Sequence, residues 1–235
     1  MKYMGSKRRI AKHILPIMLE KRLEEQCWVE PFVGGANLID KVCGWRIGND
    51  NNFYLIELFK AIQNGWIPPN ECSAEEYYHI KRNRDSFPPY LVGFVGFGCS
   101  FGSTFMAGYA RDKNPIIEKR QNYCLCAKKS ILKQKENIIG VQFHHGDYKE
   151  LNIPNKSLIY CDPPYEGTFK YSTSKNFNHS EFWQWCRNKK DEGHNVFVSE
   201  HNAPDDFECI KEIELVCNVD SRVKAKKRIE RLFTL

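Results

Sequence analysis

The sequence predicts an α/β fold in which a mostly parallel sheet is flanked by helices and interrupted by an inserted lobe. Residues 28–51 follow the order strand, glycine turn, helix, strand and terminal acid. Residues 141–199 contain apolar strand-like runs and an amphipathic helix, whereas residues 65–134 are rich in proline, aromatic residues and glycine. We therefore expect a sheet domain of residues 1–64 and 135–235, with residues 65–134 inserted into it.

The first half begins with an amphipathic helix over Ile10–Arg22, which Pro16 is expected to break or kink. Trp28–Ile39 then has the pattern of a short strand, a glycine turn and the start of a helix. A second strand at Trp45–Gly48 leads to Asp50. This order is typical of a βαβ unit, so the two strands should pair in parallel.

The second half supplies the remaining strands and a helix over Ser180–Lys190. The expected strands are Val141–His145, Leu158–Cys161, Asn195–Ser199, Ile210–Cys217 and Ile229–Leu235.

Composition excludes several classes of protein. The chain has 235 residues, of which 42% are hydrophobic and 27% charged, a globular balance. No apolar run approaches the ~20 residues of a membrane span, so we expect a cytoplasmic protein. The net charge of +6 is compatible with a polyanionic partner.

Cysteine and histidine usage predicts no metal site. The ten cysteines contain no C-x-x-C pair, and without a secretion signal we expect reduced thiols. His144 and His145 are adjacent on a predicted strand, so they point to opposite faces and are expected to be structural.

The strongest motif is Asp162-Pro163-Pro164-Tyr165, which directly follows the apolar strand Leu158–Cys161. The prolines fix the backbone beyond the strand end, so the Asp162 carboxylate and the Pro163 carbonyl are rigid acceptors at the carboxyl edge of the sheet. Two acceptors aimed at the hydrogens of an aromatic amine, such as N6 of adenine, localise its lone pair toward a methyl donor. Tyr165 offers a face on which an extruded base can stack. The competing interpretation is a surface turn, since Asp and Pro both favour turns.

A second candidate site follows the first predicted strand. A sulfonium cofactor with an adenosine half needs backbone room, an acid for the ribose diol and apolar walls. Gly34 and Gly35 leave space near the ligand, and Asp50 can accept both ribose hydroxyls. The missing G-x-G-x-x-G argues against a dinucleotide. An ordinary strand-to-helix turn is the alternative interpretation of the glycine pair.

Together these motifs resemble the Dam-type, or D12 class, family of bacterial and phage DNA adenine N6-methyltransferases. The resemblance also covers Tyr3–Lys7, Glu30–Gly35, Asn178–Phe182 and Glu230–Phe233. It implies a Rossmann-like methyltransferase sheet, mostly parallel with an antiparallel last strand. It further implies methyl transfer from S-adenosylmethionine to N6 of a flipped-out adenine in double-stranded DNA, with residues 65–134 reading the target.

The resemblance also implies roles for individual residues. The catalytic motif is Asp162, Pro163, Pro164 and Tyr165. Residues expected at S-adenosylmethionine are Tyr3, Lys7, Phe32, Gly34, Gly35, Asp50, Asp147, Tyr148 and Asp162, with Asp147 and Tyr148 beside its adenine. Without the resemblance, Lys7 would be interpreted as a solvated lysine.

Basic residues of the insertion are expected to meet DNA phosphates, namely Arg82, Arg84, Arg111, Lys113, Lys119 and Arg120. Phe94, Phe97, Phe101 and Phe105 either fill the gap left by a flipped base or form a small core. Lys170 is also expected to contact DNA and, with Tyr171, to belong to a mobile lid. The run Lys224, Lys226, Lys227 and Arg228 either tracks the duplex or forms a solvated hairpin.

Two other functions use the same residues. Methylation of RNA adenine or of cytosine N4 needs the same acceptor geometry, although related cytosine enzymes more often carry Ser at position 162. A catalytically silent DNA-binding module could retain the fold, but the intact Asp162–Tyr165 motif argues against it.

Overall fold

The computed structural model describes residues 1–166, 177–217 and 226–235. The strands are β1 Trp28–Glu30, β2 Arg46–Asp50, β3 Val141–His145, β4 Leu158–Cys161, β5 Asn195–Glu200, β6 Glu208–Cys217 and β7 Lys226–Thr234. The helices are α1 Ala11–Glu20, α2 Phe53–Gln63, α3 Ala74–Arg82, α4 Pro89–Gly98, α5 Tyr123–Ile138 and α6 His179–Asp191. Short 3-10 turns are η1 Lys7–Arg9, η2 Ile39–Lys41, η3 Arg84–Ser86, η4 Phe101–Ser103, η5 Ile117–Lys119 and η6 Tyr148–Glu150.

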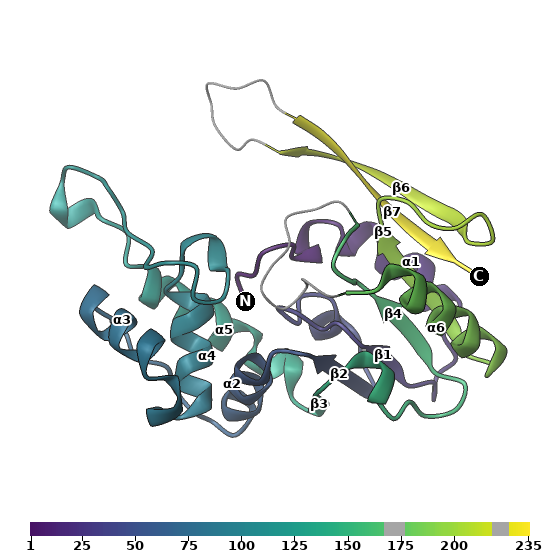
Figure 1. Ribbon diagram of the computed structural model, residues 1–235, viewed down its shortest axis with the longest axis horizontal. Helices are drawn as coiled ribbons and strands as arrows, with labels where there is room; N and C mark the ends of the chain where they lie inside the picture. The colour runs from purple at the N-terminus through teal and green to yellow at the C-terminus, as the bar shows by residue number, and fades with distance from the viewer. Residues whose placement is uncertain (167–176, 218–225) are drawn as a thin grey trace.

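The strands form one seven-stranded sheet in the order β3-β2-β1-β4-β5-β7-β6 (Figure 1). The strands β3, β2, β1, β4 and β5 pair in parallel. The last strand, β7, lies between β5 and β6 and is antiparallel to both. This topology confirms the predicted α/β class, with a mostly parallel sheet and an antiparallel last strand.

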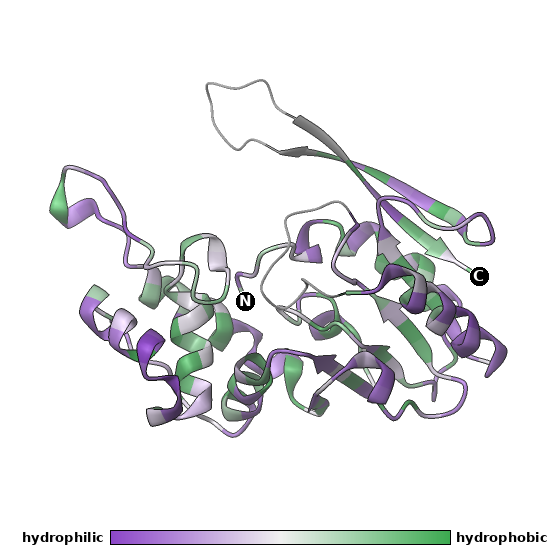
Figure 2. Cartoon of the chain, viewed as in Figure 1, coloured by the Kyte–Doolittle hydropathy of each residue, from purple (hydrophilic) through white to green (hydrophobic). Residues whose placement is uncertain are grey.

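The sheet is covered on both faces. Successive residues of a strand point to opposite faces, and in β4 Leu158 and Tyr160 belong to one core cluster while Ile159 and Cys161 belong to the other. The first cluster includes buried residues of α1 and α2, and the second includes those of α6. Figure 2 shows the hydrophobic residues along α4 and the central strands. Burial on both faces explains why β4 is apolar at every position.

One local prediction was wrong, and a second was wrong in part. The expected helix between β1 and β2 is absent, and the connection carries only η2. The segment between Gly35 and Gly44 is too short for the several turns that a stable helix needs, and Ala36 adopts a left-handed φ of 52°. Helix α1 continues through Pro16, so the predicted break is absent, while the predicted kink stays a prediction.

The inserted segment forms α3 and α4 beside the sheet, followed by a projecting loop and α5 (Figure 1). Helix α5 crosses the boundary expected at Gln134 and ends in the sheet domain. The Gln134 side chain is buried there, and its Nε2 donates to Ala36 O at 2.7 Å and to Asp40 Oδ2 at 2.9 Å. One helix therefore anchors both parts.

Among the described residues, no helix is long and apolar enough to cross a membrane.

Helices α2 and α4 cross at very short range. Gly93 of α4 faces α2, and a Cβ at this position would lie 2.1 Å from the Tyr54 carbonyl oxygen. The flanking residues Val92 and Phe94 are almost fully buried. The missing side chain of Gly93 is therefore what allows α4 to pack against the helix that follows β2.

We expect Gly93→Ala to lower the free energy of unfolding by about 1–3 kcal/mol, because the added methyl forces the two backbones apart. Urea unfolding followed by circular dichroism measures the change. Lys133→Ala, on the exposed side of α5, serves as the control and should alter stability by less than about 0.5 kcal/mol. Equal stability of the Gly93→Ala protein and the wild type would contradict the close crossing.

Candidate active site

The candidate site lies at the carboxyl edge of the parallel sheet. Asp50 ends β2, Phe32 follows β1, Asp162 follows β4 and Glu200 ends β5. Asp147 follows β3, the outermost of these strands. Because neighbouring parallel strands end at one edge, these residues form a row in the order of the strands.

Asp162 and Tyr165 meet the N-terminal segment at the centre of this row. The Nζ of Lys7 lies 2.9 Å from Asp162 Oδ1 and 4.5 Å from the centre of the Tyr165 ring. The Lys7 side chain is only 10% exposed and that of Asp162 22%. Pro163 is buried, while Pro164 and Tyr165 are half-buried. The structure thus brings together residues that are far apart in the sequence.

Glu230 of β7 completes this cluster, although its motif was noticed only as a final strand. Tyr165 donates its hydroxyl hydrogen to Glu230 Oε2 at 2.8 Å, and Lys7 Nζ lies 3.5 Å from the same oxygen. Glu230 is buried. The available signal was an acidic residue between Ile229 and Leu232 in a run that was expected to form a strand.

Glu200 was also missed. Its side chain accepts hydrogen bonds from the backbone amide of Glu166, at 2.6 Å, and from that of His201. Burial raises its pKa to about 7. Glu200 thereby fixes the chain immediately after Tyr165, and its place at the end of an apolar strand could have identified it.

Burial dominates the electrostatics of these carboxyl groups. It raises the pKa of Asp162 above its ordinary value, while the Lys7 charge opposes the rise. Glu30 is 2% exposed, accepts a hydrogen bond from Trp28 Nε1 at 2.9 Å, and has a pKa raised by burial to about 8. Near neutral pH, Glu30 is therefore mostly protonated, so it adds little negative charge beside Asp162.

Several predicted cofactor residues lie along the same edge of the sheet as Asp162, at the ends of β1, β2 and β3. Asp50 Oδ2 accepts the Gly34 N–H at 3.0 Å, and Asp50 Oδ1 accepts the Asn52 N–H at 2.9 Å. These bonds orient the carboxylate at the end of β2 and leave lone pairs that a diol can use. Burial raises the pKa of Asp50 above its ordinary value.

Aromatic side chains enclose this region. The Tyr3 ring lies over the glycine turn, with Cε1 2.9 Å from where a Gly34 Cβ would stand. On the other side, the Phe32 and Tyr148 ring centres are 5.1 Å apart. Asp147 caps the turn η6 through the Lys149 amide. A carboxylate, a glycine turn and aromatic walls fit an adenosine-containing ligand.

The six basic residues of the insertion that were predicted to meet DNA are exposed. Arg82 ends α3 and Arg84 begins η3, whereas the other four lie on the loop that leads to α5. Those four are Arg111, Lys113, Lys119 and Arg120. In Figure 1 this loop projects on the same side as the β6–β7 hairpin. Lys170, Tyr171 and Lys224 lie outside the described residues, as do the side chains of Lys226, Lys227 and Arg228.

The four phenylalanines of the insertion differ sharply in exposure. Phe94 and Phe97 are buried, and Phe105 stacks on Tyr54 with ring centres 5.5 Å apart. Phe94 and Phe97 belong to the core cluster that also contains α1 and α2, and Phe105 packs against it. Phe101 is 76% exposed, at the start of η4.

The described residues contain no group of three His, Cys, Asp or Glu side chains arranged to hold a metal ion. His144 and His145 are exposed on β3, where His145 packs edge-on against Phe53. The cysteines whose side chains are described are free thiols, and most of them are buried.

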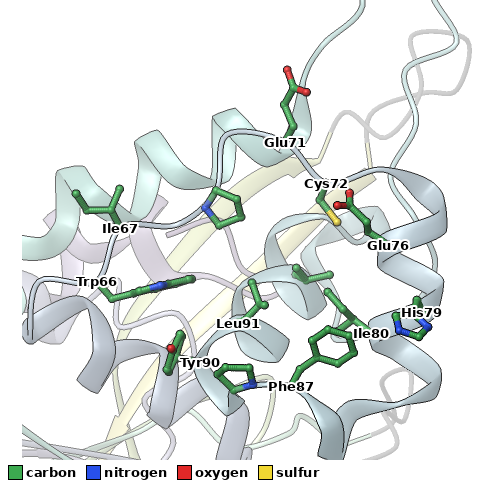
Figure 3. A pocket seen from close by; sticks show the side chains of 13 residues that line it. Trp66, Ile67, Glu71, Cys72, Glu76, His79, Ile80, Phe87, Tyr90 and Leu91 are labelled. Carbon is green, nitrogen blue, oxygen red and sulfur yellow. The ribbon is translucent and has the colours of Figure 1, made fainter.

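A separate cavity of about 470 Å³ lies in the inserted segment (Figure 3). Trp66, Phe87, Tyr90 and Leu91 supply much of its apolar lining, and His79 and Glu76 come from α3. None of its lining residues belongs to the row at the strand ends. The cavity is therefore distinct from the candidate active site.

The topology defines the class of the protein as a Rossmann-like α/β methyltransferase fold. Residues 3–88 match the family of D12 class N6 adenine-specific DNA methyltransferases. The chain is also 24% identical over 208 residues to the type II methyltransferase M.FokI of Planomicrobium okeanokoites. That similarity covers 79% of this chain and 31% of the relative, so the chain spans about a third of the relative's length. The two matches confirm the resemblance to D12 class adenine methyltransferases that the motifs predicted.

The buried Glu30 carboxyl group makes stability depend on pH. Its pKa is 4.5 in an exposed reference state and about 8 in the folded protein, so its contribution to stability falls as pH rises through this window. Glu30→Gln keeps an acceptor for Trp28 and cannot ionise. We expect the change in the free energy of unfolding caused by this substitution to be more favourable at pH 9 than at pH 5, by on the order of 2 kcal/mol.

Urea unfolding of both proteins at the two pH values measures this difference. Glu24→Gln, which alters an exposed carboxyl group, is the matched control. If Glu30→Gln changed stability equally at pH 5 and pH 9, a buried and protonated Glu30 would be excluded.

Proposed function

We propose that this chain is an adenine-specific site-specific DNA methyltransferase, which transfers the methyl group of S-adenosylmethionine to N6 of an adenine flipped out of double-stranded DNA. The observation that carries this proposal is the Asp162–Tyr165 pair. A half-buried carboxylate and an aromatic ring lie together at the end of β4, and both approach a single amine, that of Lys7. The family match of residues 3–88 supports the same chemistry.

The proposed chemistry depends on acceptors and stacking. The Asp162 carboxylate and the Pro163 carbonyl accept the two hydrogens of the N6 amine, so its lone pair turns out of the ring conjugation and becomes nucleophilic. Tyr165, held by its hydroxyl bond to Glu230, stacks on the base. S-adenosylmethionine supplies an activated methyl group, so positioning and electrostatics by the protein account for most of the catalysis.

The residues beside Asp162 support binding of this cofactor. Asp50 is oriented to accept the ribose hydroxyls, while Phe32 and Tyr148 offer apolar walls for the adenine. Tyr3 over Gly34 and Gly35 closes the side toward the N-terminal segment. The family resemblance adds Lys7 and Asp147 to the proposed cofactor contacts.

The inserted segment 65–134 is proposed to read the DNA target. Its exposed basic residues can meet phosphates, and the net charge of +6 favours a polyanion. Phe101 is exposed and can enter a base stack. Phe94, Phe97 and Phe105 are packed in or against the core cluster.

A first experiment tests donor, substrate and product together. The purified protein is incubated with unmethylated genomic DNA and methyl-labelled S-adenosylmethionine, and the DNA is digested to nucleosides. We expect the label on N6-methyladenine, and sequencing of the modified DNA then gives the target. Asp162→Ala should lower kcat at least about 100-fold, because one of two acceptors for the amine is lost.

The matched control is Asp205→Asn, which changes an exposed acidic residue outside the motif. This variant should methylate DNA at the wild-type rate. Label on cytosine would support the cytosine N4 alternative. Unlabelled DNA, together with labelled RNA in a parallel incubation with RNA, would support the RNA alternative. Unchanged methylation by Asp162→Ala would refute the proposed mechanism.

Phe101→Ala tests the proposed role of the exposed aromatic ring. Stacking of a base on an aromatic side chain stabilises a complex by about 1–3 kcal/mol, so we expect kcat/KM for the target duplex to fall about tenfold. Fluorescence of 2-aminopurine at the target position reports the flipped base and should fall in parallel. Leu23→Ala, which removes a side chain that is 69% exposed and follows α1, should leave both quantities unchanged. Normal flipping by Phe101→Ala would exclude this role.

A further inference from the structure

The Lys7 amine makes the two contacts that the proposed function assigns to the target base. Its Nζ donates to Asp162 Oδ1 at 2.9 Å and lies 4.5 Å from the centre of the Tyr165 ring. Both contacts are made by the Nζ atom of Lys7, and the Lys7 side chain is only 10% exposed.

The two amines have similar chemistry. An ammonium group and an exocyclic N6 amine both donate hydrogen bonds to a carboxylate, and a cation and a base both favour the face of a tyrosine ring. Asp162 Oδ1 already accepts a hydrogen bond from Lys7 Nζ at 2.9 Å, so a target amine that approaches the same oxygen competes with Lys7 for it.

We propose that Lys7 occupies the place of the target amine in the free enzyme, and that an entering adenine displaces it from Asp162. Lys7 is a positioning residue. In the free enzyme it orients the Asp162 carboxylate and balances the negative charge of that group until the substrate amine replaces Lys7. This inference rests on the proposed function.

Glu230 supplies the position to which Lys7 is displaced. Its Oε2 is 3.5 Å from Lys7 Nζ, close enough that a small rotation of the lysine side chain converts the contact into a hydrogen bond. The same oxygen accepts the Tyr165 hydroxyl hydrogen at 2.8 Å. Displaced Lys7 would thus keep a charged partner, and it would remain next to the ring on which the base stacks. Lys7 Nζ also donates a hydrogen bond to the Gly5 carbonyl oxygen at 3.5 Å.

Exchange of one amine for another has a measurable signature. In the wild type, the target amine only replaces the Lys7 amine on Asp162, so its net contribution to binding is small. Without the lysine amine, Asp162 keeps its hydrogen bond with Tyr165 but loses the ammonium partner that the target amine would replace, so the target amine contributes more. The contribution of the N6 amine to affinity must therefore depend on Lys7.

A double-mutant cycle between protein and DNA tests this dependence. Wild type and Lys7→Met bind two duplexes that carry the target sequence, one with adenine and one with purine, which lacks the amine, at the target position. The dissociation constants are measured at equilibrium by fluorescence anisotropy. We compare the dissociation constant for the purine duplex with that for the adenine duplex. For wild type the two should differ by no more than about threefold, and for Lys7→Met their ratio should be at least about tenfold larger than for wild type.

Two further variants sharpen the test. Lys2→Met removes an exposed positive charge from the same segment and should show the wild-type ratio. Glu230→Gln keeps an acceptor for Tyr165 but offers no charge to a displaced lysine. It should weaken binding of the adenine duplex several-fold and leave the purine duplex unchanged.

Equal ratios for wild type and Lys7→Met, or a larger ratio for wild type, would overturn the inference while leaving the proposed function intact. A wild-type protein that leaves DNA adenine unmethylated in the labelling experiment would overturn both. Failure of one proposal is therefore distinguishable from failure of the other.

Discussion

Burial of the central sheet on both faces is the constraint on which the rest of the structure depends. Strand β4 has no exposed face, so its four residues are apolar and its first polar side chain is Asp162, just beyond the strand end. The same constraint places Asp50 and Glu200 at the ends of β2 and β5. Because these strands run in parallel, the polar groups excluded from the core gather at one edge. The site is a direct consequence of how the core is built.

That edge contains more carboxyl groups than nearby cations. Asp162 and Glu230 both approach Lys7, and the buried residues Glu30 and Glu200 end the strands on either side of β4. Burial raises the pKa of Glu30 to about 8 and that of Glu200 to about 7. Protonation thus relieves part of the repulsion, and Lys7 neutralises much of the remainder. A substrate amine that enters this site meets acceptors whose charges are already balanced.

The inserted segment is held to this site by helix packing. Gly93 lets α4 approach the backbone of α2, which follows the Asp50 strand, and α5 returns into the core beside the glycine turn through Gln134. The loop with Phe101 and the loop with Arg111–Arg120 are therefore attached to elements that also position the strand ends. A lobe joined through two helices can present side chains to DNA in a fixed relation to Asp162.

The sequence by itself determined the parallel sheet, the strand limits at Val141–His145 and Leu158–Cys161, and the motif that follows β4. These features are local, since alternating or continuous apolar runs and prolines act through neighbouring residues. Tertiary structure alone decided that the β1–β2 connection lacks a helix, that α5 belongs to both parts, and that Lys7, Asp162 and Glu230 meet. The family resemblance placed Lys7 and Asp162 at one cofactor, but it did not predict their contact with each other or with Glu230. That contact arises only when β7 inserts beside β5 and the N-terminal segment packs across the ends of the strands.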